Sequence, residues 1–224
     1  KMSHKWDLPK TLMGGTLAMQ QAGTRYLPRH PAENARVYQE RAKRVVLRNY
    51  YRRTVQKLMG RIFTNPVIPT EDVTADILSY LKNIDLMGQG LNTFAQNWFQ
   101  DALICGISYV LIDFPALTDH QAPAYSDEAR RPYAVHIPAE NLIAAQWETV
   151  QGNHRLSQIR IQETAIEYDG FSEIEVPQIR IVTPDSWEIY RTDKQGGWHL
   201  VGEGQNSLGE IPLVALYTNR TGFM

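Results

Sequence analysis

The chain has 224 residues and a mass of 25.6 kDa; 43% of its residues are hydrophobic, 21% are charged, and its formal net charge is −1 at pH 7. These values are typical of a folded chain that forms one substantial domain or two small ones, and they exclude an intrinsically disordered or coiled-coil protein. The longest nearly apolar run, Ala102–Ile112, has about half the length of a membrane-spanning helix, so we expect no membrane span.

Basic residues are concentrated in the first third of the chain. Residues 25–61 contain 11 Lys or Arg and two Glu, a local net charge of +9, so the remaining residues carry −10. Because electrostatic steering depends on charge within a Debye length of about 10 Å, this segment is expected to face a polyanion or an acidic protein surface. An ordinary solvated helix face fits the same pattern.

The spacing within this segment predicts one helix over 32–59, with Pro31 suited to its first turn and Gly60 as its C-terminal cap. One face of this helix would carry a basic stripe at i, i+3, i+7 and i+11: Arg41, Arg44, Arg48 and Arg52. Another face would carry an apolar stripe: Leu47, Tyr51, Val55, Leu58 and Ile62. The predicted helix can therefore pack on a core and present its guanidinium groups outward.

Two further helices and a strand are expected next. Thr70, followed by two acidic residues, predicts a helix that runs to about Leu81. Apolar residues at helical spacing predict a longer helix from Leu91 that stops at Gly106. Residues 107–114 are then β-branched and aromatic, as in a strand that follows directly from a helix.

The rest of the chain predicts an exposed loop over 115–132 and a series of short strands separated by turn residues. The expected strands are residues 133–137, 142–147, 157–167, 176–183, 187–191, 198–201 and 212–217. Short turns between successive strands make the pairing antiparallel. The sequence therefore predicts a single α+β domain over 1–224, with helices in 1–105 packed on an antiparallel sheet in 106–220.

Catalytic and metal-binding motifs are not found. The six histidines lack the spacing of a zinc site, no G-x-S-x-G or P-loop occurs, and we expect neither a metal nor a cofactor. Asp113 with His120, or His136 with Glu140, could act as acid and base, but such pairs arise by chance in a chain with six histidines. The lone Cys105 is expected to be a small buried hydrophobe, and with no secretory signal visible a reducing compartment is expected.

Short motifs across nearly the whole chain resemble, in number and order, those of tailed-bacteriophage portal proteins, specifically an uncharacterised portal-like phage family. The motifs are structural rather than catalytic, and the last one resembles the end of the sheet in a portal wing domain. They are Trp6–Leu8, Met19–Pro28, Glu33 with Tyr38–Arg41, Arg53–Val55, Leu58–Gly60, Asp85–Gly88, Ala102–Gly106, Val110–Asp113, Arg131–Tyr133, Pro138–Asn141 and Gly209–Val214.

The resemblance implies a structural protein and not an enzyme. Portal proteins form rings, usually of twelve copies, at one capsid vertex, and the terminase motor drives double-stranded DNA through the ring. The implied partners are copies of this chain, terminase, the major capsid protein, head-completion and tail proteins, and double-stranded DNA bound without sequence specificity. The implied locations are the bacterial host cytoplasm during assembly and then the virion. Portal chains continue through stem, clip and crown segments, none of which occurs in these 224 residues, so the chain corresponds to a wing.

Two other functions stay open at this point. The basic helix would also suit a stand-alone DNA-binding or capsid adaptor module. A magnesium-dependent DNA-processing enzyme could use Asp113 with a loop carboxylate such as Asp119 or Asp127. Within a portal wing, the stripe Arg41, Arg44, Arg48 and Arg52 could contact DNA, the coat protein or the acidic half of a neighbouring subunit, and we expect a protein neighbour.

Overall fold

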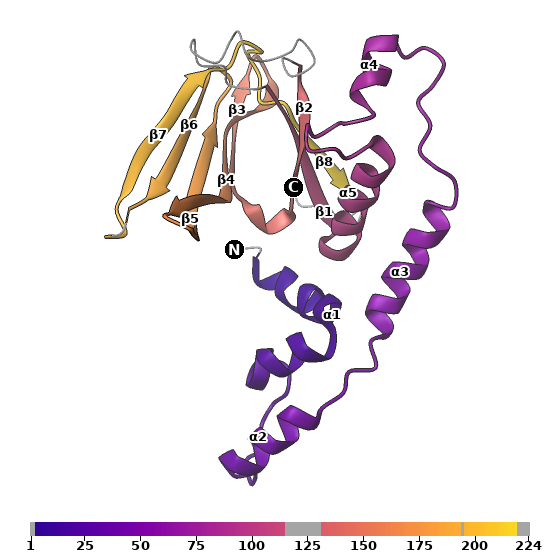
Figure 1. Cartoon of the computed structure of the whole chain (residues 1–224), viewed down its shortest axis with the longest axis vertical. Coiled ribbons are helices and arrows are strands. Elements are labelled where there is room, and N and C mark those ends of the chain that lie inside the picture. Colours follow the sequence, from indigo (N-terminus) through magenta and orange to yellow (C-terminus); the bar gives the residue numbers. More distant parts are fainter. Residues whose placement is uncertain (1–2, 115–130, 194, 219–224) are drawn as a thin grey trace.

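The computed structural model describes residues 3–114, 131–193 and 195–218, and its helices precede its strands (Figure 1). The helices are α1 Ser3–Ala22, α2 Ala35–Arg44, α3 Tyr50–Ile62, α4 Ala75–Tyr80 and α5 Leu91–Cys105, with 3-10 turns η1 Gly23–Arg25 and η3 Ala139–Asn141. The strands are β1 Ile107–Asp113, β2 Tyr133–Ile137, β3 Leu142–Val150, β4 Asn153–Asp169, β5 Ser172–Val182, β6 Ser186–Thr192, β7 Trp198–Gln205 and β8 Leu213–Tyr217. The α+β prediction is confirmed. None of the described helices has the length and apolar character needed to cross a membrane.

The strands form two antiparallel sheets rather than the single predicted one. Sheet A has the order β2-β1-β8, and sheet B is the meander β3-β4-β5-β6-β7. The predicted strand 107–114 is the centre of sheet A, where Tyr109 pairs with Ile137 on one side and with Ala215 on the other. β1 takes both its partners from β2 and β8, and the described strands of the meander pair only with one another. Nearly all of the predicted loop 115–132 lies outside the described residues.

The main core lies between the two sheets. It joins sheet A, sheet B and the segment before β8 through buried aliphatic side chains: Leu111, Ile137, Ile159, Ile161, Val182 and Ile211. Helix α5 covers the other face of sheet A, where Phe94 packs against Val110 and Ala134. The molecule is therefore layered as sheet B, sheet A and α5, with the helices α1–α3 extending below and beside these layers (Figure 1).

Gly106 makes the connection between α5 and β1, as the sequence predicts. It caps the helix in the left-handed conformation with φ +83°, and its N–H donates to the carbonyl oxygen of Ala102. A side chain is strained in that conformation, whereas glycine is not. The buried end of α5 can thus pass directly into the buried strand β1.

Helix α1 is an element that the sequence analysis did not identify. It contains Pro9, and it is interrupted at Gly15, which has φ +77° and ψ −152°. These residues disfavour a continuous helix and obscure the helical pattern. Trp6 nevertheless anchors the first part of α1, because it packs with Cys105, Ile107 and Ala139.

The single helix predicted over 32–59 is wrong, because the chain breaks between α2 and α3. Val45 is extended (φ −60°, ψ 132°), and the Asn49 side chain caps α3 by accepting from the Arg52 N–H at 2.8 Å. The amide of Gln20 donates to the carbonyl oxygens of Lys43 and Val45. Contacts from α1 therefore satisfy backbone groups that a continuous helix would have satisfied itself.

Other boundaries also differ from the prediction. Asn34 caps α2, so Pro31 precedes the helix instead of lying in its first turn, and Gly60 lies inside α3 instead of ending it. Helix α4 begins only after Thr74, because Thr70 closes a turn with the N–H of Val73. Strands β4 and β5 are longer than expected, since their hairpin continues beyond the sheet core to a turn at residues 170–171.

One arginine links the two sheets. The Nη1 atom of Arg180 on β5 lies 2.5 Å from Asp113 Oδ2 on β1, and its Nε lies 3.1 Å from Glu163 Oε1 on β4. Tyr133 on β2 also donates to Asp113, at 3.1 Å. Burial lowers the pKa of Arg180, but Glu163 and Asp113 raise it by more, so the guanidinium stays charged. Asp113, proposed above as a catalytic acid, is thus held in an ion pair.

We predict that Arg180→Met destabilises the fold by about 2–4 kcal/mol, because it leaves two partly buried carboxylates without a counter-charge. Urea unfolding followed by circular dichroism measures this loss. Arg155→Met is the matched control, since Arg155 and Glu148 pair at 2.6 Å on the exposed surface, and such pairs contribute less than about 1 kcal/mol. Equal losses in the two variants would contradict a bridging role for Arg180.

Candidate functional site: the helical arm and the buried polar cluster

Residues 20–84, which we call the helical arm, contain almost no fully buried residue. Between Met19 and Asp85, Val55 is the only residue that is buried. Large apolar side chains of the arm are exposed instead, among them Val46 at 77%, Ile68 at 75% and Ile62 at 51%. An arm with this surface is suited to contact with another molecule.

The four arginines of the predicted stripe do not share one face, because the break at residues 45–49 separates them. Arg41 and Arg44 lie on α2, Arg48 lies in the break, and Arg52 lies on α3. Arg41 is already paired: its Nε and Nη2 atoms each lie 2.9 Å from a carboxylate oxygen of Glu33. The continuous stripe is therefore wrong, and the role of these residues as partner contacts remains a prediction.

The other members of the predicted stripe are partly engaged within the chain. Arg44 lies 3.7 Å from Glu40, and the Arg52 guanidinium lies beside Gly15, in the kink of α1. Arg48 is exposed. These guanidinium groups therefore do not lie along one helix face.

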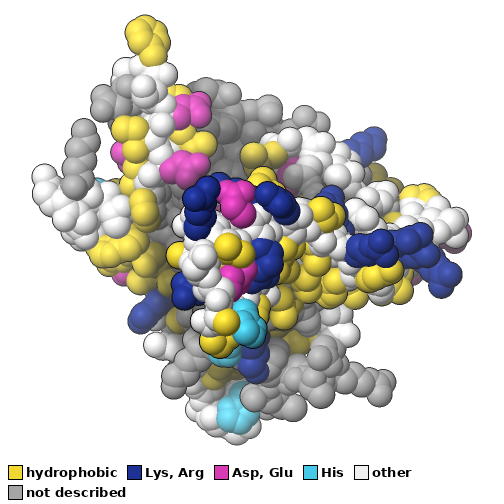
Figure 2. Space-filling model, turned by 90° about the horizontal axis from the view of Figure 1, so that it is seen from below, with side chains coloured by type: hydrophobic (Ala, Val, Ile, Leu, Met, Phe, Trp, Pro, Cys, Tyr) yellow, Lys and Arg dark blue, Asp and Glu magenta, His cyan; other side chains and the backbone are white. Residues whose placement is uncertain are grey.

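A different basic stripe runs along α3. Arg53, Lys57 and Arg61 follow i, i+4, i+8, are exposed, and form no ion pair with any described residue. Tyr50, which is 68% exposed, lies on the same face by helical spacing. Viewed from below, Lys and Arg side chains gather over the arm with hydrophobic side chains between them (Figure 2). Asn is a preferred helix N-cap, so Asn49 is a sequence signal that a separate helix begins at residue 50. Helical spacing counted from that start would have revealed this stripe.

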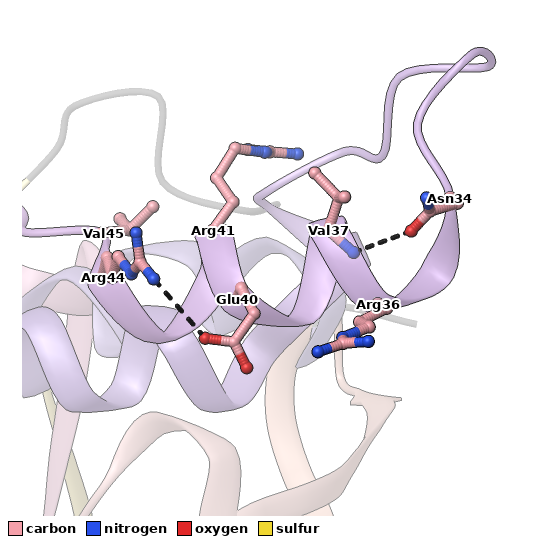
Figure 3. Close-up of a pocket in the computed structure, with 7 residues that line it drawn as sticks. All are labelled: Asn34, Arg36, Val37, Glu40, Arg41, Arg44 and Val45. Atoms are coloured by element: carbon pink, nitrogen blue, oxygen red, sulfur yellow. Dashed lines mark hydrogen bonds and ion pairs between the residues drawn. The ribbon is translucent and has the colours of Figure 1, made fainter.

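Two hollows formed by described residues do not resemble a catalytic cleft. One, of about 490 Å³, runs along α2 between its caps Asn34 and Val45, and its lining comes from that single helix (Figure 3). A hollow with one wall cannot enclose a substrate. The other, of about 530 Å³, lies between the sheets and is lined mainly by apolar side chains, with Glu140 as its single ionisable carboxylate.

A buried polar cluster joins α1, α5 and sheet A. Ser108, which is fully buried, lies 2.8 Å from His136 Nε2, and its hydroxyl donates to Asp101 Oδ2 at 3.2 Å. The Lys10 ammonium of α1 contacts Glu140 and lies 3.9 Å from Asp101 Oδ1. The sequence analysis considered His136 and Glu140 as an acid–base pair. In the structure, the polar contacts of His136 are Ser108 and Asp101.

The cluster lacks the geometry of a hydrolytic triad. Asp101 approaches the same imidazole nitrogen as Ser108, at 3.8 Å, instead of the opposite one that would orient the ring. Ser108 has no exposed surface on which a substrate could be attacked. Of the other acid–base candidates, His120, Asp119 and Asp127 lie outside the described residues.

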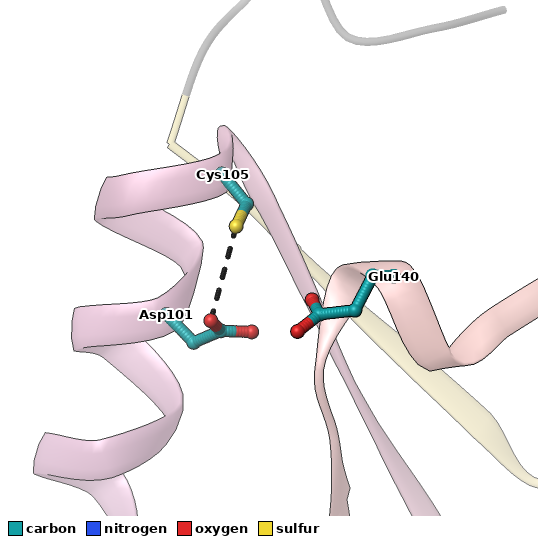
Figure 4. A group of neighbouring side chains, drawn as sticks. All are labelled: Asp101, Cys105 and Glu140. Carbon is teal, nitrogen blue, oxygen red and sulfur yellow. Dashed lines mark hydrogen bonds between the residues drawn. The ribbon is translucent and has the colours of Figure 1, made fainter. Parts of the chain in front are cut away.

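The same region contains three groups that could together ligate a metal. Asp101 and Cys105 project from α5 toward Glu140 of η3, and their ligand atoms lie within 4.8 Å of one another (Figure 4). Burial and the Asp101 carboxylate raise the pKa of the Cys105 thiol to about 12, whereas a metal ligand has to be a thiolate. Lys10 supplies a positive charge beside both carboxylates. These groups fit an internal salt bridge better than a metal site.

The cluster instead positions α1 on the core. Burial raises the pKa of Asp101, but His136, Lys10 and the N–H of Ala139 outweigh that effect, so its pKa lies below the usual 3.8. The carboxylate is thus ionised and holds Lys10 of α1 against α5 and η3. Because α1 also supports the break between α2 and α3, this cluster fixes where the arm begins.

No protein-family model matches the chain, and the search of curated proteins finds no match.

We predict that Asp101→Asn destabilises the fold by about 1–3 kcal/mol. The neutral amide cannot compensate the positive charge of Lys10, and it cannot accept the hydrogen bonds of Asp101 as an ionised carboxylate does. Since the folded-state pKa of Asp101 is lowered, this contribution is complete at neutral pH and disappears as the pH falls below 4. Urea unfolding at pH 7 and at pH 3 measures both effects. Glu148→Gln, in an exposed pair, is the control; an equal loss in the control would contradict the assignment.

Proposed function

We propose that this chain is the wing-like part of a tailed-bacteriophage portal protein, a structural subunit that assembles with copies of itself into a ring around a DNA channel. The support comes from two sides. The ordered motifs of the sequence resemble that family, and the described fold is an α+β layer structure with an unpartnered helical arm. In this role the chain supplies a passage and docking surfaces, while the ATP-driven motor is a separate protein.

The observation that carries the proposal is the amount of exposed surface. A compact monomer of this mass exposes roughly 10,400 Å², whereas this chain exposes 15737 Å². Large apolar side chains of the described arm, Val46, Ile68 and Ile62 among them, contribute to this area. Exposed surface of this extent and apolar character supports the proposal that the chain is a subunit whose surface is covered in an assembly.

The surface of the arm also supports the proposal that this subunit contacts more than one neighbour. Its exposed apolar residues favour protein contact, and its basic residues favour an acidic protein surface or DNA phosphates. Phosphate contacts of this kind carry no sequence information, which agrees with a channel through which any DNA sequence passes.

A stand-alone DNA-binding or capsid adaptor module is the second candidate, and the basic stripe on α3 favours it. Arg53, Lys57 and Arg61 could bind consecutive phosphates, with the logarithm of the affinity falling by about 0.9 per neutralised phosphate for each tenfold rise in salt. This candidate explains the basic stripe but leaves the exposed apolar residues of the arm without a function.

The size of the protein separates the two candidates. We predict that the full gene product forms particles of several subunits with a central hole, because the arm has to be covered by neighbouring copies. Negative-stain microscopy and sedimentation velocity over a hundredfold range of concentration measure this. A protein that remains a single subunit at the highest concentration and binds duplex DNA with steep salt dependence would favour the adaptor and contradict the portal proposal.

A further inference from the structure

The free end of the β4–β5 hairpin, residues 163–175, is the acidic counterpart of the basic arm. It contains five acidic residues and no Lys or Arg. Glu163 and Glu167 are engaged with Arg180 and Arg191 respectively. Glu173 and Glu175 are exposed, and neither forms an ion pair within the described ranges.

These two free carboxylates share one face of the hairpin with two exposed apolar side chains. The register pairs Glu173 with Tyr168 and Glu175 with Ile166. Ile161 on β4 points into the core, so the alternation of side chains along the strand places Ile166 and Tyr168 on the opposite face. Tyr168 is 74% exposed and Ile166 is 57% exposed. We call these four residues the outer hairpin patch.

The outer hairpin patch matches α3 in spacing as well as in charge. Successive cations of the α3 stripe are four residues apart, which is about 6 Å along a helix axis. Glu173 and Glu175 are two residues apart on a strand, which is about 6.8 Å. A helix that lies along β5 can therefore bring Arg53 and Lys57 opposite the two carboxylates, with Tyr50 and Tyr168 available as aromatic contacts.

The two surfaces cannot meet within one chain. Helix α3 lies on the right of the molecule and the β4–β5 hairpin lies on the left, with sheet A between them (Figure 1). A contact between them has to join two copies and has to be heterologous, because one copy contributes the helix and the other contributes the hairpin. Repetition of a heterologous contact gives a closed ring or a helical filament.

We infer that α3 of one copy docks on the outer hairpin patch of the next copy, with Arg53 and Lys57 opposite Glu173 and Glu175. This inference rests on the proposed function and deepens it by naming the contact between subunits. A second copy accounts for both exposed surfaces at once, whereas DNA would cover the cations alone and leave Tyr168 and Ile166 exposed.

Charge reversal on each side tests the contact in the full gene product. One variant carries Arg53→Glu with Lys57→Glu, and the other carries Glu173→Lys with Glu175→Lys. Each variant alone places like charges opposite each other, so we expect its dissociation constant to rise at least about tenfold by sedimentation velocity. Circular dichroism should show unchanged folding, because exposed charges contribute little to stability.

Mixing the two variants is the decisive arm of the experiment. In an equimolar mixture an alternating arrangement of the two variants joins opposite charges at every contact, so the variants should co-assemble to within about threefold of the wild-type dissociation constant. Arg36→Glu with Lys82→Glu is the matched control: it changes the net charge of the arm equally, at exposed residues outside α3, and should leave assembly unchanged.

The failure of this inference differs from the failure of the proposed function. A wild-type protein that stays a single subunit overturns both. A wild-type protein that assembles, with variants that assemble equally well or do not recover on mixing, overturns the named contact alone. Loss of binding to a 30-base-pair duplex in the α3 variant, with assembly unaffected in the hairpin variant, would assign the stripe to DNA and also overturn the contact.

Discussion

Strand β1 is the element on which the packing of this protein depends, because both of its faces and both of its edges are covered. Leu111 packs into the core shared with sheet B, while Val110 and Ser108 face α5. The same strand pairs with β2 and β8 and carries the Asp113 carboxylate that receives Arg180. The layers on its two sides are thus held in place by a single strand of seven residues, four of which are buried.

Polar contacts, together with the packing of Trp6 of α1 on the core, carry this order outward to the arm. Lys10 attaches α1 to the carboxylates of α5 and η3. Further along α1, Gln20 and Thr16 satisfy backbone groups of residues 43–47. Hydrogen bonds and ion pairs are directional, so they define the course of the arm while leaving its apolar side chains accessible to a partner. This division between a packed core and an accessible arm is what the proposed assembly requires.

The parts of the fold that could be predicted are those that depend on neighbouring residues in the sequence. The helix ending at Gly106, the strand that follows it and the meander of β-strands come from local periodicity and turn residues. The break at residues 45–49 could not be predicted in this way, since it depends on Gln20 and Thr16. The predicted stripe of Arg41, Arg44, Arg48 and Arg52 is not continuous for the same reason. The buried cluster joins Lys10, Asp101 and His136, which are too far apart in sequence for any spacing rule.

The pairing of β1 with β8 has a consequence for how the chain folds. Ile107 pairs with Tyr217, so more than 100 residues have to be synthesised and arranged before this ladder can close. Contacts between such distant segments raise the contact order and slow folding, because loop closure costs entropy before any pairing is gained. Until then one edge of the central strand has no hydrogen-bonding partner, so a nascent chain is exposed to aggregation until β8 has been added.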